Sequence, residues 1–142
     1  MKILVAVDGS KFSMHAVKYA AKLVESLLPN SNAITLLSVH DDIGLRHAKA
    51  FVGRDVVADY LRELSDKDLK PAQKILDTAG VKHDMVVKTG KVAQEIVDCA
   101  KSGKFDLIVL GSKGRGAIAD LLIGSVAQRV LTMAQTPVLL VK

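Results

Sequence analysis

The chain has little cysteine for disulfide bonds and no long apolar run that could span a membrane. One of its 142 residues is a cysteine, Cys99, so no disulfide can form within the chain, which is consistent with a reducing compartment. No segment approaches the roughly 18 uncharged apolar residues that a membrane-spanning helix needs. The first residues reach an acid at Asp8 and do not resemble a signal peptide. We therefore expect a cytoplasmic protein that does not bind a membrane.

Aromatic residues are also scarce, with two tyrosines, three phenylalanines and no tryptophan. The net charge of +5 would suit a nucleic-acid partner, but the basic residues are scattered and few rings are available to stack on bases. A solvated basic surface is the favoured interpretation, and its mild positive field would help to attract a small anion. We expect no nucleic-acid partner.

Apolar segments alternate with helical patterns along the whole chain. Short apolar runs predict strands at residues 2–7, 33–39, 83–88, 105–110 and 138–141, and most of the sequence between them has helical spacing. Five such alternations predict an α/β fold, with a parallel sheet that is covered by helices on both faces. There is no internal repeat or linker, so we expect one domain over residues 1–142.

Three local patterns give sharper expectations. Residues 40–54 are expected to form a polar loop, partly packed through Leu45 and Phe51. Residues 55–79 are expected to form a helix that breaks near residues 65–69, because an Asp68 cap would place Pro71 in a first turn. Ser125 and Gln128 have the spacing of a capping box for the last helix.

The stretch that organises the chain is a glycine-rich loop after the fourth predicted strand. Gly111, Gly114 and Gly116 follow that strand closely, and Gly124 with Ser125 opens the last helix. Glycines let the backbone approach a phosphate, and the helix start supplies free N–H groups. We favour an anion cradle over the alternative that these glycines only make turns.

Two commoner nucleotide motifs fail in this loop. The spacing from Gly111 to Gly116 matches a P-loop, but Ala117 and Ile118 stand where that motif needs Lys and Ser or Thr. A dinucleotide fingerprint needs an acid about 20 residues further on, and no acid follows Asp120.

The spacing Gly111-x-x-Gly114, nine residues, then Gly124-Ser125 resembles the ATP-binding signature of the universal stress protein family. The resemblance covers the chain, because the segments at residues 2–10, 36–40 and 136–141 fall where that family has its first, second and last strands. It implies a Rossmann-like open sheet of order 3-2-1-4-5, similar to the adenine nucleotide alpha hydrolases. The ligand would then lie between the ends of the first and fourth strands.

The resemblance also implies roles for single residues. Asp8 would bind the ribose, although capping of the next helix remains an alternative. Backbone atoms of Val39 would contact the adenine. Apart from the resemblance, Arg115 is a cation of the glycine-rich loop, and its guanidinium either contacts a phosphate or stays solvated. The full set of expected binding residues is Ala6, Val7, Asp8, Val39, Gly111, Gly114, Arg115, Gly116, Gly124, Ser125 and Val126.

The expected ligand is ATP, and any magnesium would arrive with its phosphates. We expect slow hydrolysis or none, because no acid is evidently placed to activate water and Asp120 is supported by proximity alone. The residues His40, Asp41, Asp42 and His47 match no strong metal pattern, and Cys99 is expected to pack in the core or at its boundary.

The last strand, Val138–Val141, is expected at a sheet edge, where a second copy could pair with it to form a homodimer. The favoured function is an ATP-binding stress-response protein that acts on an unknown regulatory partner. Two alternatives remain open: a nucleotide-free interaction module of the same fold, and a weak ATP hydrolase or adenylating enzyme.

Overall fold

The computed structural model describes residues 1–27, 31–116, 120 and 122–142. Ala117 and Ile118, which follow Gly116 in the glycine-rich loop, lie outside these residues. The elements in chain order are β1 (Lys2–Ala6), α1 (Lys11–Ser26), β2 (Ala33–His40), α2 (Asp42–Val52), α3 (Arg54–Thr78), β3 (His83–Thr89), α4 (Val92–Ser102), β4 (Leu107–Gly111), α5 (Ser125–Met133) and β5 (Val138–Val141).

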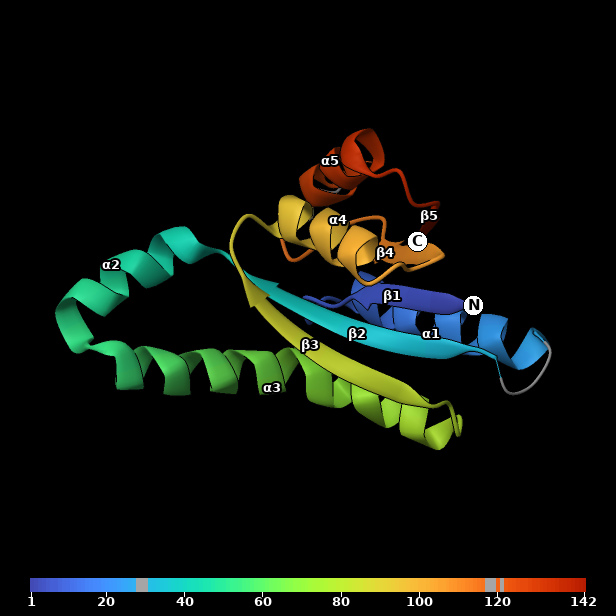
Figure 1. Ribbon diagram of the computed structural model, residues 1–142, viewed down its shortest axis with the longest axis horizontal. Coiled ribbons are helices and arrows are strands. Elements are labelled where there is room, and N and C mark those ends of the chain that lie inside the picture. Colours follow the sequence, from blue (N-terminus) through green and yellow to red (C-terminus); the bar gives the residue numbers. More distant parts are fainter. Residues whose placement is uncertain (28–30, 117–119, 121) are drawn as a thin grey trace.

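The five strands form one parallel sheet in the order β3-β2-β1-β4-β5, as the resemblance implies. The strand order reverses between β1 and its neighbours, since β2 lies on one side of β1 and β4 on the other (Figure 1). β1 and β4 pair through the register Ile3↔Leu107 to Val5↔Val109. The turns that leave these two strands therefore lie side by side, and a ligand-binding crevice is expected there.

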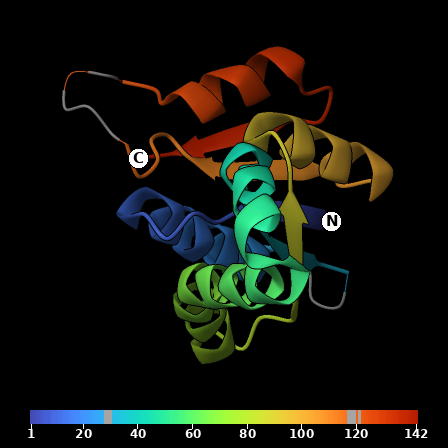
Figure 2. The same ribbon diagram turned by 90° about the vertical axis from the view of Figure 1, so that its left-hand side faces the viewer.

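Helices cover both faces of the sheet, as Figure 2 shows. Side chains alternate along β1, so that Ile3 and Val5 pack on one face and Leu4 on the other. The first face is covered by α1 and α3 through a buried set that includes Ala16, Ala20, Ala72 and Leu76. The second face is covered by α4 and α5 through a buried set that includes Ala93, Ile96, Ala127 and Val130. The predicted class, an open α/β sheet with helices on both faces, is confirmed.

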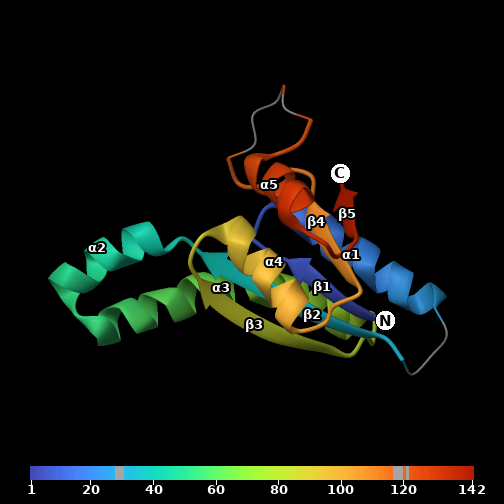
Figure 3. The same cartoon turned by 45° about the horizontal axis from the view of Figure 1, so that its top comes forward.

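The expected loop at residues 40–54 is wrong, because most of it is the helix α2. The Asp41 carboxylate accepts a hydrogen bond from the N–H of Ile43 and caps the helix start, and Gly53, with φ of +84°, ends it. α2 and α3 together form a hairpin that projects beyond the sheet (Figure 3). Leu45 is buried as expected, whereas Phe51 is exposed, so the expected packing of Phe51 is also wrong.

The expected break in the next helix is wrong as well. α3 runs without interruption over 25 residues and carries Pro71 in its interior. Asp68 does not cap a helix start; its side chain is buried and contacts another part of the chain. Tertiary packing of Leu69, Ala72 and Leu76 against the sheet stabilises the helix through the proline. No helix within the described part of the chain is long and apolar enough to cross a membrane.

Candidate functional site

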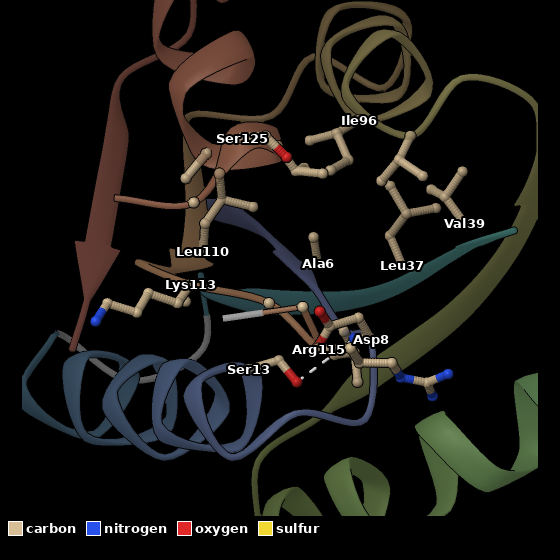
Figure 4. A pocket seen from close by; sticks show the side chains of 18 residues that line it. Ala6, Asp8, Ser13, Leu37, Val39, Ile96, Leu110, Lys113, Arg115 and Ser125 are labelled. Carbon is tan, nitrogen blue, oxygen red and sulfur yellow. Dashed lines mark hydrogen bonds between the residues drawn. The ribbon is translucent and has the colours of Figure 1, made fainter. Parts of the chain in front are cut away.

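A cavity of about 400 Å³ opens where β1 and β4 end, between the glycine-rich loop and α5 (Figure 4). Pockets that hold small ligands have volumes of about 300–1,000 Å³. The cavity is therefore large enough for a ligand of nucleotide size, and it lies at the reversal of strand order.

One end of the cavity is apolar. Ala6 lies at the end of β1, and Leu37 and Val39 lie two residues apart on the same face of β2. Ile96 of α4 faces them from the other side, as Figure 4 shows. Leu37 and Ile96 are buried, and Ala6 and Val39 are partly buried. These side chains from three elements form a slot that would accept a flat apolar ring.

Asp8 lies in the turn after β1. Its Oδ1 accepts a hydrogen bond from the N–H of Ser10 at 2.9 Å. The cap of α1 is instead Ser10, whose Oγ accepts from the N–H of Ser13 at 3.2 Å. The helix-cap alternative for Asp8 is therefore wrong. The turn holds this carboxylate at the cavity wall, where Oδ2 is directed toward Gly114.

The glycine-rich loop and the start of α5 line the other end of the cavity. The N–H of Gly124 donates to the carbonyl of Ser112 at 2.7 Å and ties the helix start to the loop. The N-cap is Gly124, and Ser125 is the first helical residue, so the expected capping box is wrong. Because glycine has no side chain to cap the helix, the first N–H groups of α5 are available to a ligand.

Close contacts explain three of the glycines in the loop. A Cβ on Gly114 would lie 2.8 Å from Oδ2 of Asp8, and one on Gly124 would lie 3.3 Å from Cα of Lys113. A Cβ on Gly111 would lie 2.7 Å from the carbonyl carbon of Phe12, so this glycine is needed to pack β4 against α1. Gly116 has no neighbour within 4 Å of such a Cβ, and its backbone borders open space at the cavity.

Arg115 reaches out of the loop toward α3, where its Nη2 contacts Oδ1 of Asp68. The Asp68 side chain is 4% exposed and that of Arg115 is 55% exposed. Burial raises the pKa of Asp68, and the Arg115 guanidinium and His40 partly oppose this shift. The ion pair covers Gly9, where a Cβ would lie 2.6 Å from Oδ1 of Asp68.

His40 lies beside this ion pair at the end of β2. Its Nε2 is 3.1 Å from Oγ of Ser38 and 3.0 Å from Oγ of Ser65. Since the Ser65 hydroxyl donates to the carbonyl of Leu61, its oxygen must accept from Nε2–H of His40. Burial lowers the pKa of His40, while the Asp68 carboxylate raises it to a smaller extent. The buried imidazole is thus favoured in its neutral form.

The comparison with known proteins agrees with this geometry. The model of the universal stress protein family matches residues 1–142. The chain belongs to this family. It is similar to the universal stress protein MJ0531 of Methanocaldococcus jannaschii, with 34% identity over 141 residues that cover 99% of this chain and 81% of that protein.

Solved structures of universal stress proteins share the fold. The structure of MJ0577 is 27% identical, with a TM-score of 0.85, and the match covers 99% of this chain and 94% of that one. The protein from Archaeoglobus fulgidus in complex with dAMP is 22% identical, with a TM-score of 0.71 and coverage of 100% and 98%. The Arabidopsis thaliana protein with AMP bound is 20% identical, with a TM-score of 0.69 and coverage of 100% and 91%.

In this universal stress protein, the eleven residues expected from the sequence line the same cavity. They are Ala6, Val7, Asp8, Val39, Gly111, Gly114, Arg115, Gly116, Gly124, Ser125 and Val126. Sequence analysis missed Ser13, Leu37, Val92, Ile96, Leu110 and Ala127, which line it too. Because side chains alternate along a strand, Leu37 lies on the same face as Val39 and could have been predicted from it. Val92 and Ile96 of α4 have no sequence signal beyond an apolar helix face.

Three further residues are not among the expected binding residues. Lys113 borders the cavity, but its ammonium points away from Ser125 and lies 5.9 Å from the Phe12 ring centre (Figure 4). Cys99 is a residue of α4 that packs against the core, and burial raises the pKa of its thiol. Asp120 is exposed and is not among the residues that line the cavity. Within the described residues, no group of three or more His, Cys, Asp or Glu side chains could hold a metal ion.

Proposed function

We propose that this universal stress protein binds ATP in the cavity between β1, β4 and α5, and acts as a nucleotide-dependent regulator. The observation that carries the proposal is the cavity itself, which joins an apolar slot, a carboxylate and a glycine cradle in that order. These are the three chemistries of a base, a ribose and a chain of phosphates. Similar universal stress proteins have been solved with AMP and dAMP.

In this proposal the base binds at the apolar end of the cavity, and the ribose binds at the neighbouring Asp8 carboxylate. The adenine ring lies in the slot beside Ala6 and Val39, with Leu37 and Ile96 as its walls. Oδ1 of Asp8 is held by Ser10, so Oδ2 is the oxygen that accepts a hydrogen bond from a ribose hydroxyl. A side chain at Gly114 would collide with this oxygen, which explains why the loop has a glycine there.

The phosphates lie in the cradle made by Gly114, Gly116 and the start of α5. The first intrahelical hydrogen bond of α5 runs from the N–H of Gln128 to the carbonyl of Gly124. The N–H groups of Ser125 and Val126 precede it, so they and the positive end of the helix dipole are directed at an anion. Magnesium, where it is present, enters with the phosphates and is coordinated by their oxygens.

Hydrolysis is slow or absent in this proposal. Among the described residues that line the cavity, Asp8 is the one carboxylate, and it lies beside the ribose rather than at the outer phosphate. A general base must be within hydrogen-bond reach of the attacking water. Bound ATP therefore persists long enough to act as a signal to a protein partner.

The decisive experiment is to purify the protein without added ligand, denature it, and identify any released nucleotide by chromatography with mass spectrometry. ATP or ADP near one per chain is the expected result. If the protein is empty, calorimetry with millimolar ATP and magnesium follows. Failure to bind under those conditions would contradict the proposal and favour an interaction module with an unused crevice. ATP hydrolysis at about 10 per second that is lost in Asp120→Asn would instead favour an enzyme.

The proposal includes a homodimer through β5. This strand pairs with β4 on one side and is the last strand of the sheet on the other. Its four residues, Val138–Val141, are apolar and half-buried. An open apolar edge is a template for pairing with another chain, and a two-fold axis would bring two such edges together.

A further inference from the structure

The ion pair between Asp68 and Arg115 joins two segments that serve different parts of the fold. Arg115 belongs to the glycine-rich loop, whose backbone forms the phosphate cradle of the proposed site. Asp68 belongs to α3, which packs against the opposite face of the sheet from α5. Neither Asp68 nor its neighbours on α3 line the cavity. The contact is therefore not needed to form the cavity walls.

The direction of Arg115 is the observation that matters. Figure 4 shows its guanidinium directed past Asp8 toward α3, and away from Ser125 at the phosphate end. In this orientation the guanidinium is directed away from the start of α5, so it has to turn before it can donate to a phosphate held there. With 55% of its side chain exposed, Arg115 can leave Asp68 without unpacking any core residue.

We propose that Asp68 is a specificity-determining residue that holds Arg115 away from the phosphate cradle, so that only a ligand with competing phosphate charge recruits this arginine. The inference rests on the proposed function, because it assigns a role within the same site. A nucleoside leaves the ion pair intact. A triphosphate competes with Asp68 for the guanidinium and offers two acceptor oxygens in a bidentate geometry.

The surroundings of Asp68 support a role beyond stability. Burial raises its pKa, which means that the fold disfavours its charged form even with Arg115, His40 and Lys67 nearby. Asp8 adds a like charge that raises it further. The buried carboxylate is therefore retained at a cost in desolvation, which its contact with Arg115 offsets in part.

Calorimetry with ATP and with adenosine tests the proposal. Asp68→Asn keeps the shape of the side chain and removes the competing charge, so ATP affinity should rise about two- to fivefold, the range of a half-exposed ion pair. Adenosine affinity should not change. The matched control is Asp66→Asn on the same helix, which removes an equal charge from an exposed side chain paired with Lys70. It should leave both affinities unchanged at physiological salt.

The arginine variant separates this role from a structural one. In an Arg115→Gln background, Asp68→Asn should no longer raise ATP affinity, because there is no guanidinium to release. An equal gain in Asp66→Asn, a gain that persists without Arg115, or an unchanged ratio of ATP to adenosine affinity would overturn the inference. If the wild-type protein binds neither ligand, the proposed function fails as well; if it binds both, the inference can fail alone.

A measurement on the wild-type chain covers the case in which Asp68→Asn does not fold. The side-chain Nε resonance of Arg115 should shift on titration with ATP and stay in place on titration with adenosine. The same shift with both ligands, or with neither, would show that Asp68 does not control the arginine.

Discussion

At the scale of single residues, the site depends on positions where a side chain would collide with a neighbour. Gly114 and Gly124 each approach another part of the cavity wall closely, to Asp8 in the first case and to Lys113 in the second. Both have ordinary backbone angles, since neither is among the glycines with positive φ. The requirement for glycine there comes from space and not from backbone strain.

Gly124 therefore offers a graded test of the phosphate cradle. A Cβ at this position would be 3.3 Å from Cα of Lys113, so Gly124→Ala should shift the loop slightly and weaken ATP binding moderately. Gly124→Val adds two branches that fill the cradle, and should lower affinity by more than about tenfold, or 1.4 kcal/mol. Calorimetry measures both variants.

The control for these glycine variants is Leu122→Ala, a change in the same loop at a side chain that is 80% exposed and does not line the cavity. It should bind ATP as the wild type does. Normal ATP affinity in a folded Gly124→Val protein would place the phosphates elsewhere.

His40 should make the free energy of unfolding depend on pH, and burial of the imidazole sets the sign of this dependence. The folded chain lowers the pKa of His40, and unfolding returns it to its ordinary value of 6.5. The unfolded chain then binds more protons just below pH 6.5, so the contribution of His40 to stability is complete above that pH and is lost as the pH falls through it.

Urea unfolding of the wild type and His40→Gln between pH 5 and 8 measures this effect. The wild type should lose more free energy of unfolding toward pH 5 than the variant, because glutamine does not titrate. Asp68 titrates in both proteins, so its effect cancels approximately in the comparison. Parallel pH profiles would contradict this, because they would mean that folding leaves the pKa of His40 unchanged.

At the scale of elements, α2 and α3 are helices where local sequence signals predict a loop and a break. Gly44 and the charged residues at 40–54 suggested a loop, although Asp41 and Gly53 provide an N-cap and a C-cap for a helix between them. Pro71 suggested a break, and the helix continued because its apolar residues on both sides of the proline pack on the sheet. Propensity is a weak signal when tertiary contacts oppose it.

Pro71 should then cost α3 stability. Its ring excludes the carbonyl of Lys67 from a normal hydrogen bond, and the side chain is exposed. Pro71→Ala should raise the free energy of unfolding by about 1–3 kcal/mol in a denaturant titration. A destabilised Pro71→Ala protein would contradict this.

At the scale of the whole molecule, the open edge at β5 predicts how two copies assemble. Ile108 N–H donates to the carbonyl of Pro137 and Ser112 N–H donates to that of Val141. In a parallel ladder alternate residues bond to the same neighbour, so these two hydrogen bonds imply that the N–H groups of Leu139 and Val141 point to β4. The N–H of Leu140 is then left facing the open edge.

Leu140→Pro removes that N–H without disturbing the ladder to β4, and should convert the dimer to a monomer in sedimentation velocity at micromolar concentration. Leu140→Ala is the matched control, because it loses the same core packing but keeps the N–H, and should remain a dimer. A wild-type chain that sediments as a monomer, or an unaffected Leu140→Pro dimer, would show that copies do not pair through this edge.

The class of fold and most of the expected site residues follow from sequence patterns and from the resemblance to the family. Apolar runs of strand length alternating with helical faces predict a parallel sheet between two helical layers. The resemblance to the family implies the strand order, which brings the ends of β1 and β4 together. The glycines at residues 111–116 and Gly124 lie next to those ends along the chain. The resemblance to the universal stress protein family supplied the strand order and the positions at the ends of β1 and β2, and the eleven expected residues line one cavity.

Contacts that cross between the layers of the fold are not visible in the sequence patterns. The partner of Arg115 is Asp68, 47 residues away, and nothing in the spacing of either residue indicates the other. The same holds for Ile96, which reaches the apolar slot from α4. Such contacts depend on how each helix packs on the sheet, and this is set by the volumes of many buried side chains together rather than by any short pattern.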